Sequence, residues 1–324
     1  MLLNNRYADF PEAERFLREC EDAYILIHQS PDGDCIGSGY SLQAALRQMG
    51  KRAKVLCADP IPARFDFLKP AEPEEDFEPK CIITVDVADP KLLGSYAEQY
   101  GECVDLCIDH HISNQHYAKQ TVLLSDASAA CEVLCGLYRQ MGIELTEYIA
   151  ACLYTGIATD TGCFKFSNTT AHTHETAAEI MAAFPDIPYS RINRQMFEVK
   201  SPERMKAECA MIMAMEYHLD GKCAMICVSQ ELIERTGMNP EDTDGMANLP
   251  LQPEGVEVGI TMREREPEVW KISMRSANAV NVSAICQTLG GGGHVKAAGC
   301  LLKGSLEEVK TVLLEAVRKG MEQA

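Results

Sequence analysis

The sequence lacks any apolar run that could cross a membrane. No stretch of it approaches about 18 consecutive apolar residues, the length at which a transmembrane helix is predicted. Its first residues, MLLNNRYADFPEAERF, also lack the basic segment and following apolar segment of a secretory signal. We therefore expect a cytoplasmic protein with no membrane partner.

The sequence also lacks closely spaced pairs of cysteines of the CxxC type. The chain has 15 cysteines, an odd number, and no two of them are spaced as CxxC. This absence argues against zinc knuckles and thioredoxin-type redox sites. Most of the cysteines lie in apolar runs, as Cys81, Cys107 and Cys152 do, where a thiol behaves as a small hydrophobic side chain. Reduced thiols in a cytoplasmic protein are the simplest interpretation.

Basic residues are scarce relative to acidic ones. The chain has 30 lysines and arginines against 48 aspartates and glutamates, which gives a formal net charge of −18. Such a field repels polyanions and argues against a general binder of long DNA or RNA. A small anionic substrate stays compatible with it, because bound cations can reverse the sign of the field locally.

The 324 residues, 46% of them hydrophobic, are enough for two domains. In the first half, predicted strands at 24–27, 54–58, 81–87 and 104–111 alternate with predicted helices at 11–20, 41–50, 127–142 and 146–159. This alternation predicts an α/β domain with a mainly parallel sheet flanked by helices, which binds ligands at the carboxyl ends of its strands. From residue 216 a second pattern of strands and helices predicts a smaller α/β domain. The predicted boundaries are 1–190, a linking helical region at 191–215, and 216–324.

Acidic and histidine residues follow these apolar segments. They are His28, Asp32 and Asp34 in HQSPDGDCIGSG, Asp86 after CIITV, Asp109, His110 and His111 after VDLCI, and Asp160 in YTGIATDTGCF. In a parallel sheet the groups at the strand ends converge on one edge. Carboxylate and imidazole together suit Mn²⁺, Fe, Co or Zn better than Ca²⁺. So many ligands suggest two ions that share a bridging carboxylate, the arrangement used to displace a phosphate ester in line.

Each of these residues also has a structural explanation. An aspartate in a loop with proline and glycine often caps the next helix, and Asp160 could simply form a turn. A single histidine at a strand end is usually part of the core or surface without a further role. The occurrence of four such groups at equivalent positions favours the metal centre.

A run of glycines, GGGGH at 290–294, stands apart from these groups. Gly291, Gly292 and Gly293 would let the backbone approach a phosphate closely, with His294 beside it. The alternative is a loop that ends a helix, but a helix cap needs only one glycine.

Three polar residues are further candidates for substrate contacts. Arg275, next to Ser276 in KISMRS, could bind a phosphate or stack on a base, or it could be a solvated charge. Asn114 in DHHISN could contact substrate or form a turn.

The quoted stretches, with VDVAD, CIDHHISN and YTGIATDTGCFKFSNTT, resemble the motifs of the DHH phosphoesterase superfamily. ISMRSANAVNVSAICQTLGGGGHVKAAGC resembles its DHHA1 domain, so the resemblance covers about residues 20–303. Among the members, the two-domain layout is similar to the nanoRNase/pAp phosphatase group. Those enzymes hydrolyse very short oligoribonucleotides and remove the 3′-phosphate of pAp. Cyclic-di-AMP and pApA phosphodiesterases are one alternative, and a non-catalytic nucleotide-binding regulator is another.

The resemblance implies a role for each residue. His28, Asp32 and Asp86 would hold one divalent ion, and Asp34, Asp86, His110 and Asp160 the other, with Asp86 as the bridge and Mn²⁺ as the favoured metal. His111 would contact the scissile phosphate or the leaving oxygen, and Asp109 would orient a histidine. The implied partner is a short oligonucleotide or nucleotide, and the oligomeric state, a homodimer included, is left open.

Overall fold

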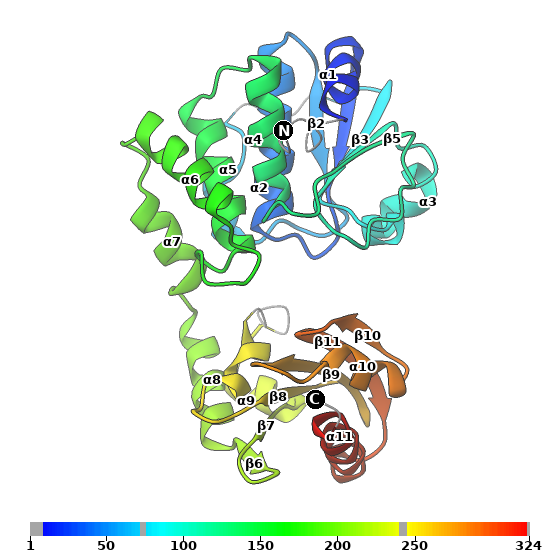
Figure 1. Ribbon diagram of the computed structural model, residues 1–324, viewed down its shortest axis with the longest axis vertical. Coiled ribbons are helices and arrows are strands. Elements are labelled where there is room, and N and C mark those ends of the chain that lie inside the picture. The colour runs from blue at the N-terminus through cyan, green and yellow to red at the C-terminus, as the bar shows by residue number, and fades with distance from the viewer. Residues whose placement is uncertain (1–8, 72–75, 240–244, 323–324) are drawn as a thin grey trace. The chain divides into compact units, whose positions relative to one another are not determined.

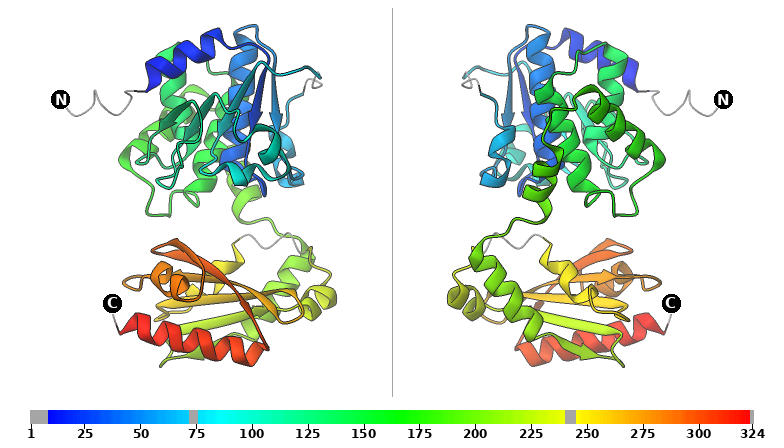
Figure 2. Two further views of the ribbon diagram at one scale, coloured as in Figure 1. Left: turned by 90° about the vertical axis from the view of Figure 1, so that its right-hand side faces the viewer. Right: turned by 90° about the vertical axis from the view of Figure 1, so that its left-hand side faces the viewer.

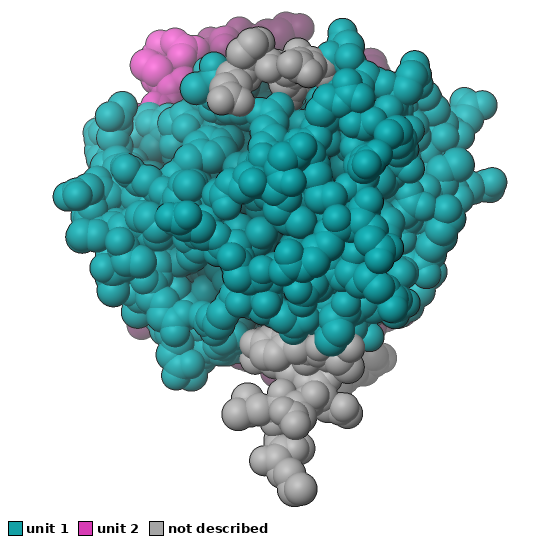
Figure 3. Space-filling view, turned by 90° about the horizontal axis from the view of Figure 1, so that it is seen from above, with its two compact units in different colours: residues 1–199 teal, residues 200–324 magenta. Residues whose placement is uncertain are grey.

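The computed structural model describes residues 9–71, 76–239 and 245–322. Contacts divide the chain into two compact units, Met1–Val199 and Lys200–Ala324, which Figure 3 shows in teal and magenta. No helix of the described residues is long and apolar enough to span a bilayer. The predicted linking region, 191–215, contains most of α7 (Tyr189–Phe197) and all of α8 (Pro202–Met213). The proposed domain boundaries themselves stay predictions.

Unit 1 contains a five-stranded sheet in which all neighbouring strands are parallel, as predicted (Figure 1). Its spatial order is β2-β1-β3-β4-β5. The strands are β1 (Ala23–Leu26), β2 (Ala53–Leu56), β3 (Cys81–Val85), β4 (Leu106–Asp109) and β5 (Gln120–Leu123). The sheet order changes direction between β1 and β3, and such a switch point opens a crevice at the carboxyl ends of the strands. The chain segments after β1, β3 and β4 therefore leave the sheet side by side.

Helices cover both faces of this sheet (Figure 1, Figure 2). The larger core lies under α1 (Phe10–Glu19), α2 (Gly33–Gln48), α4 (Ala130–Met141) and α5 (Glu147–Asp160). A smaller core on the other face includes residues of η2 (Pro90–Tyr96) and α3 (Ala97–Tyr100). The remaining helices of the unit are η1 (Ala63–Leu68), α6 (Ala171–Ala183) and α7.

Helix α2 begins at Gly33, eight residues before the predicted start at residue 41. The predicted helix thus leaves out the Gly-Ser-Gly run at residues 37–39, which lies inside the observed helix. A Cβ atom at Gly37 would lie 2.4 Å from the carbonyl oxygen of Cys152 in α5, so glycine allows the two helices to approach closely. At Gly156 of α5 a Cβ atom would lie 2.8 Å from Oδ1 of Asp34. The close packing of these helices thus fixes the position of the Asp34 carboxylate.

Unit 2 contains a six-stranded mixed sheet of order β10-β11-β9-β8-β7-β6. Its strands are β6 (Glu216–His218), β7 (Cys223–Val228), β8 (Val258–Glu266), β9 (Val269–Ser276), β10 (Gly292–His294) and β11 (Ala297–Lys303). Residues of α10 (Val282–Thr288) and α11 (Leu306–Met321) share one core with the sheet. Residues of α8, α9 (Gln230–Thr236) and η3 (Met246–Leu251) share another core with β7. The smaller α/β domain is therefore confirmed.

Candidate metal centre

His28 lies just beyond the end of β1. Its Nδ1 atom is 2.8 Å from the carbonyl oxygen of Gln29, so Nδ1 carries the proton and donates it there. The other nitrogen, Nε2, lies 3.7 Å from Oδ1 of Asp32 and 3.5 Å from Oδ2 of Asp86. A backbone contact thus orients the ring, and its free nitrogen faces two carboxylates, as in histidines that bind metal.

Asp32 and Asp34 are placed by the first turn of α2. Asp32 caps the helix, since its Oδ1 accepts hydrogen bonds from the backbone N–H groups of Asp34 and Cys35 at 3.0 and 3.1 Å. Burial opposes ionisation of Asp32, but His28 and these backbone donors lower its pKa to about 2. The structural explanation of Asp32 as a helix cap is therefore correct, and the same carboxylate also faces His28.

The Asp34 carboxylate is buried against the start of α4. It accepts hydrogen bonds from the backbone N–H groups of Ala130 at 2.6 Å and Cys131 at 2.9 Å. Burial and the nearby Asp86 and Asp160 carboxylates raise its pKa well above the usual value. So many carboxylates in a buried space repel one another unless a cation is present.

Asp86 follows the central strand β3, with β1 on one side and β4 on the other. Its φ of 59° lies in the left-handed region, which non-glycine residues rarely adopt and which is enriched at functional sites. Its side chain is only 3% exposed, and its Oδ1 atom has no hydrogen-bond partner among the described residues. Oδ2 faces His28, whereas Oδ1 lies 3.5 Å from Nε2 of His110. The two oxygens therefore point to different groups of ligands, as a bridging carboxylate requires.

His110 begins the segment after β4. Its Nδ1 atom lies 3.2 Å from the carbonyl oxygen of Ala127, and its buried Nε2 atom has no hydrogen-bond partner in the part of the chain that the structure describes. Nε2 is 3.8 Å from Oδ2 of Asp34 and 3.6 Å from Oδ2 of Asp160, the last residue of α5. Burial opposes protonation of His110, but Asp86 and Asp34 raise its pKa to about 10. Burial also raises the pKa of Asp160 to about 7.

The donor set fits divalent metal ions. The structure brings together all six residues predicted as ligands, in overlapping groups whose ligand atoms lie within 4.8 Å of one another: His28, Asp32, Asp34, Asp86, His110 and Asp160. A bound ion would satisfy the buried atoms of Asp86 and His110 that lack a partner among the described residues. Mixed carboxylate and imidazole donors suit a transition metal such as manganese.

His111 and Asp109 form a hydrogen-bonded pair next to this group. Nδ1 of His111 donates to Oδ1 of the fully buried Asp109 at 2.8 Å. This hydrogen bond raises the pKa of His111. The amide of Asn114 donates to the second oxygen of Asp109 at 2.6 Å. Because Asn114 is buried, we propose that it positions Asp109, in place of the substrate contact considered from the sequence.

Comparison with protein families matches residues 22–157 to the N-terminal domain of the DHH family and residues 222–323 to the DHHA1 domain. The bifunctional oligoribonuclease and PAP phosphatase NrnA of Thermus thermophilus is 33% identical over 308 residues, which cover 93% of this chain and 90% of that protein. The chain belongs to the DHH phosphoesterase family. Five of the six candidate ligands lie within the residues matched to the DHH domain, and Asp160 lies three residues beyond them.

Two further comparisons define the range of this likeness. An exopolyphosphatase-related protein of Bacteroides fragilis has the same fold, with a TM-score of 0.88 at 23% identity and 96% of each chain covered. The cyclic-di-AMP phosphodiesterase PdeA of Listeria monocytogenes is 22% identical over 94% of this chain, but only 48% of that protein is covered.

In the DHHA1 domain, Arg275, Gly292 and Gly293 line a groove of about 530 Å³ with Arg265 and Lys271. Nη1 of Arg275 donates to the carbonyl oxygen of Met274 at 3.0 Å. No ion pair joins Arg275 to a carboxylate of the described residues. A cation held in this way is available to an anion.

Other predicted contacts of this domain have different partners. The N–H group of Gly291 donates to the carbonyl oxygen of Cys286 at 2.8 Å, so it is not free for a phosphate. Ser276 is buried, and its hydroxyl donates to Oε1 of Glu257 at 3.4 Å. The predicted loop is partly strand β10, in which Gly293 has a φ of 142° and His294 is exposed. His294 stays a candidate for a substrate contact, and so does Gly292, where a Cβ atom would have no neighbouring atom of the described residues within 4 Å.

Sequence reasoning missed two kinds of residue at the metal centre. Cys35 belongs to the group formed by His28, Asp32 and Asp86, although in the sequence it reads as one more small apolar residue. Asn168 donates to the carbonyl oxygen of Asp160 at 3.1 Å. Asn168 lies in the stretch FKFSNTT, whose resemblance to the family was the available signal.

Proposed function

We propose that this protein is a two-metal phosphoesterase that hydrolyses very short oligoribonucleotides and removes the 3′-phosphate of pAp. The observation that supports this most strongly is the buried Asp86, whose two carboxylate oxygens face two different histidine and carboxylate groups. The related oligoribonuclease and PAP phosphatase of Thermus thermophilus supports the choice of substrate class.

Among the described residues the candidate ligand atoms form three overlapping groups, which are His28, Asp32, Cys35 and Asp86, then Asp86, Asp109, His110 and His111, then Asp34, His110 and Asp160. His28, Asp32 and Asp86 would hold one ion. Asp34, Asp86, His110 and Asp160 would hold the other, because Oδ1 of Asp86 lies 3.5 Å from Nε2 of His110. When bound, a pair of divalent ions lowers the pKa of an attacking water and neutralises negative charge on the phosphoryl group. The backbone donors to Asp32 and Asp34 keep these carboxylates in place before substrate arrives.

His111 would supply a proton to the leaving oxygen. Its Nδ1–H is fixed by Asp109, so Nε2 is the nitrogen available to substrate. The hydrogen bond to Asp109 raises the pKa of His111 and thereby favours the protonated ring near neutral pH. The ribose 3′-oxygen is a poor leaving group, so a proton donor at this position matters.

The DHHA1 domain would bind the part of the substrate beyond the scissile bond. Arg275 and His294 are candidates for contacts to phosphate or base. The net charge of −18 disfavours long polyanions, so a few nucleotides are the expected length.

A substrate comparison tests the proposal. Purified protein is incubated with Mn²⁺ and with pAp, a diribonucleotide, cyclic di-AMP or a 24-mer RNA, and kcat/KM is measured for each. We expect the highest values for pAp and the diribonucleotide and a steep fall for the 24-mer. A preference for cyclic di-AMP would favour the alternative phosphodiesterase, and no turnover of any substrate would favour the non-catalytic regulator.

Three further properties belong to the same proposal. They are Mn²⁺ as the metal used, a cytoplasmic location and a homodimer as one alternative for the assembly. Sedimentation velocity of the purified protein decides the last of these.

A further inference from the structure

A thiol lies among the candidate ligand atoms of His28, Asp32 and Asp86. Cys35 is fully buried in the first turn of α2. Its Sγ belongs to the same group as the ligand atoms of His28, Asp32 and Asp86, all within 4.8 Å of one another. Asp86 is itself almost fully buried, and its Oδ2 faces His28 within this group. Its other oxygen, Oδ1, has no hydrogen-bond partner among the described residues and faces His110, which is independent evidence for a ligand at the centre that the two groups share.

We propose that Cys35 is a fourth protein ligand of the ion held by His28, Asp32 and Asp86. This inference rests on the metal ligands assigned under the proposed function. The two ion positions would then differ in chemistry, because one has a sulfur donor and the other has only nitrogen and oxygen donors. A thiolate donor would raise the affinity of this position for a thiophilic ion such as Zn²⁺ or Co²⁺ relative to Mn²⁺, and Mn²⁺ could still bind there. Ligation through sulfur would release the thiol proton to solvent.

The competing explanation is that Cys35 only completes the cap of α2. The backbone N–H of Asp32 donates to its Sγ at 3.3 Å, and Sγ lies 3.6 Å from the carbonyl oxygen of Asp32. A serine hydroxyl can make the same kind of contacts without being a comparable ligand for a soft ion. Cys35→Ser therefore separates the two explanations.

Two neighbouring thiols provide matched controls. Sγ of Cys57 lies 3.4 Å from the carbonyl oxygen of His28, and Sγ of Cys131 lies 3.7 Å from the carbonyl oxygen of Asp34. Both therefore touch the backbone of a candidate ligand. Neither belongs to a group of candidate ligand atoms found among the described residues.

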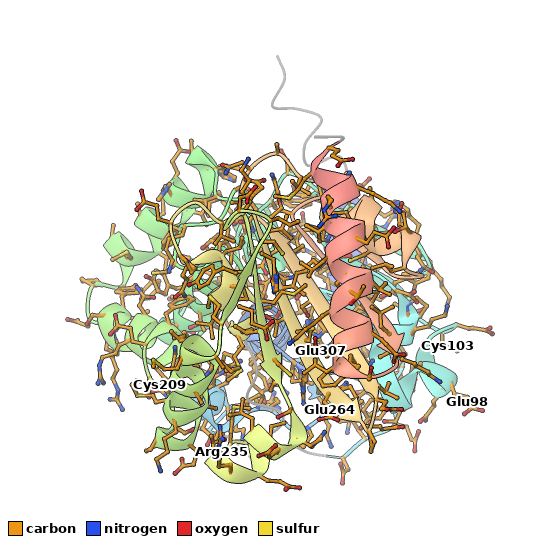
Figure 4. The ribbon with its side chains drawn as sticks, turned by 90° about the horizontal axis from the view of Figure 1, so that it is seen from below. Glu98, Cys103, Cys209, Arg235, Glu264 and Glu307 are labelled. Carbon is orange, nitrogen blue, oxygen red and sulfur yellow. The ribbon has the colours of Figure 1, made fainter. Side chains whose placement is uncertain are left out.

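The exposed thiols are removed first. Cys103 and Cys209 are exposed, and Figure 4 labels both. Replacing them with serine in the full-length protein removes adventitious sulfur donors. All further substitutions are made in this background.

The test is the absorption spectrum of the cobalt-loaded protein. Metal-free protein is titrated with Co²⁺, and bound cobalt is measured by elemental analysis of the same samples. A Co²⁺–thiolate bond gives a near-ultraviolet charge-transfer band, whereas cobalt bound by nitrogen and oxygen alone gives only weak visible bands. We expect the charge-transfer band in the background protein and in its Cys57→Ser and Cys131→Ser variants, and its loss in Cys35→Ser. We also expect Cys35→Ser to reduce the preference for Zn²⁺ over Mn²⁺ by about tenfold or more, since even an outer partner of a metal ligand contributes about 10–100-fold to affinity.

Two results would overturn the inference. One is bound cobalt without the band in the background protein, and the other is a band that persists in Cys35→Ser. A background protein that binds no cobalt would overturn the ligand assignment itself. Turnover with Mn²⁺, measured separately, shows whether the proposed function fails as well.

Discussion

Asn114→Ala distinguishes a positioning residue from a substrate contact. The amide of Asn114 donates to Oδ2 of Asp109 at 2.6 Å, while the other oxygen of Asp109 receives N–H groups of His110 and His111. Alanine therefore leaves one oxygen of a fully buried carboxylate without this donor. A hydrogen bond to a charged group is worth about 1.5–3 kcal/mol, so the free energy of unfolding should fall by about that amount.

The same substitution should lower kcat more than it changes KM. Asp109 orients the His111 ring, and loss of such an outer partner typically costs about 10–100-fold in activity. Steady-state kinetics with a diribonucleotide and Mn²⁺, together with urea unfolding of the same samples, measures both effects. If Asn114 instead contacted substrate, KM would rise while the stability stayed unchanged.

Asn193→Ala is the matched control. Its amide donates to the hydroxyl of Tyr154 at 2.9 Å, and Tyr154 is not a candidate ligand. We expect a loss of about 0.5–1.5 kcal/mol in unfolding free energy, the value of a neutral hydrogen bond, and unchanged kcat. Equal losses of kcat in both variants would refute the positioning role of Asn114.

Three other predictions concern substrate, metal and pH. Arg275→Ala should reduce kcat/KM for a diribonucleotide by about 10–150-fold, which corresponds to the loss of one charge-assisted hydrogen bond of about 1.5–3 kcal/mol. Hydrolysis of bis-p-nitrophenyl phosphate should barely change. Equal losses on both substrates would show that Arg275 does not contact substrate and is only a solvated charge. EDTA should abolish turnover, with recovery on Mn²⁺ and poorer recovery on Ca²⁺, measured as kcat; full activity in EDTA would contradict this. Burial raises the pKa of Asp160 to about 7, and Asp86 raises that of His110 to about 10 against the effect of burial. Between pH 5 and 8 the folded, metal-free protein therefore binds more protons than the unfolded chain, so its melting temperature should fall as pH rises. Mn²⁺ should stabilise the protein most at high pH, where the ligands are deprotonated. A melting temperature of the metal-free protein that rises with pH would contradict the assignment of Asp160 and His110 to this centre.

The candidate metal centre could be located in the sequence because His28, Asp86 and His110 each follow a largely apolar strand. CIITV is buried at all five positions, and the charge that follows it marks the strand end. A parallel sheet brings such ends together, so the approximate site follows from the alternation of strands and helices. That one oxygen of Asp86 faces His28 and the other faces His110 could not be predicted without knowing that β3 lies between β1 and β4.

The rest depended on tertiary contacts that composition does not reveal. Glycines disfavour helices, yet Gly37 lies inside α2 because α5 packs against it. Cys35 could not be assigned to the centre without knowing that α2 starts at Gly33. Asn114 and Ser276 look like surface polar residues in the sequence, but both are buried with protein partners.

The metal content of Asp86→Ala tests the central claim most directly. Metal-free wild type, Asp86→Ala and His111→Ala are titrated with Mn²⁺, bound metal is counted by elemental analysis, and circular dichroism checks that each variant is folded. Because Asp86 faces both groups of ligands, we expect wild type and His111→Ala to bind two ions and folded Asp86→Ala to bind both far more weakly. Two ions bound by Asp86→Ala with the affinity of wild type would contradict the bridging role and, with it, the two-metal account.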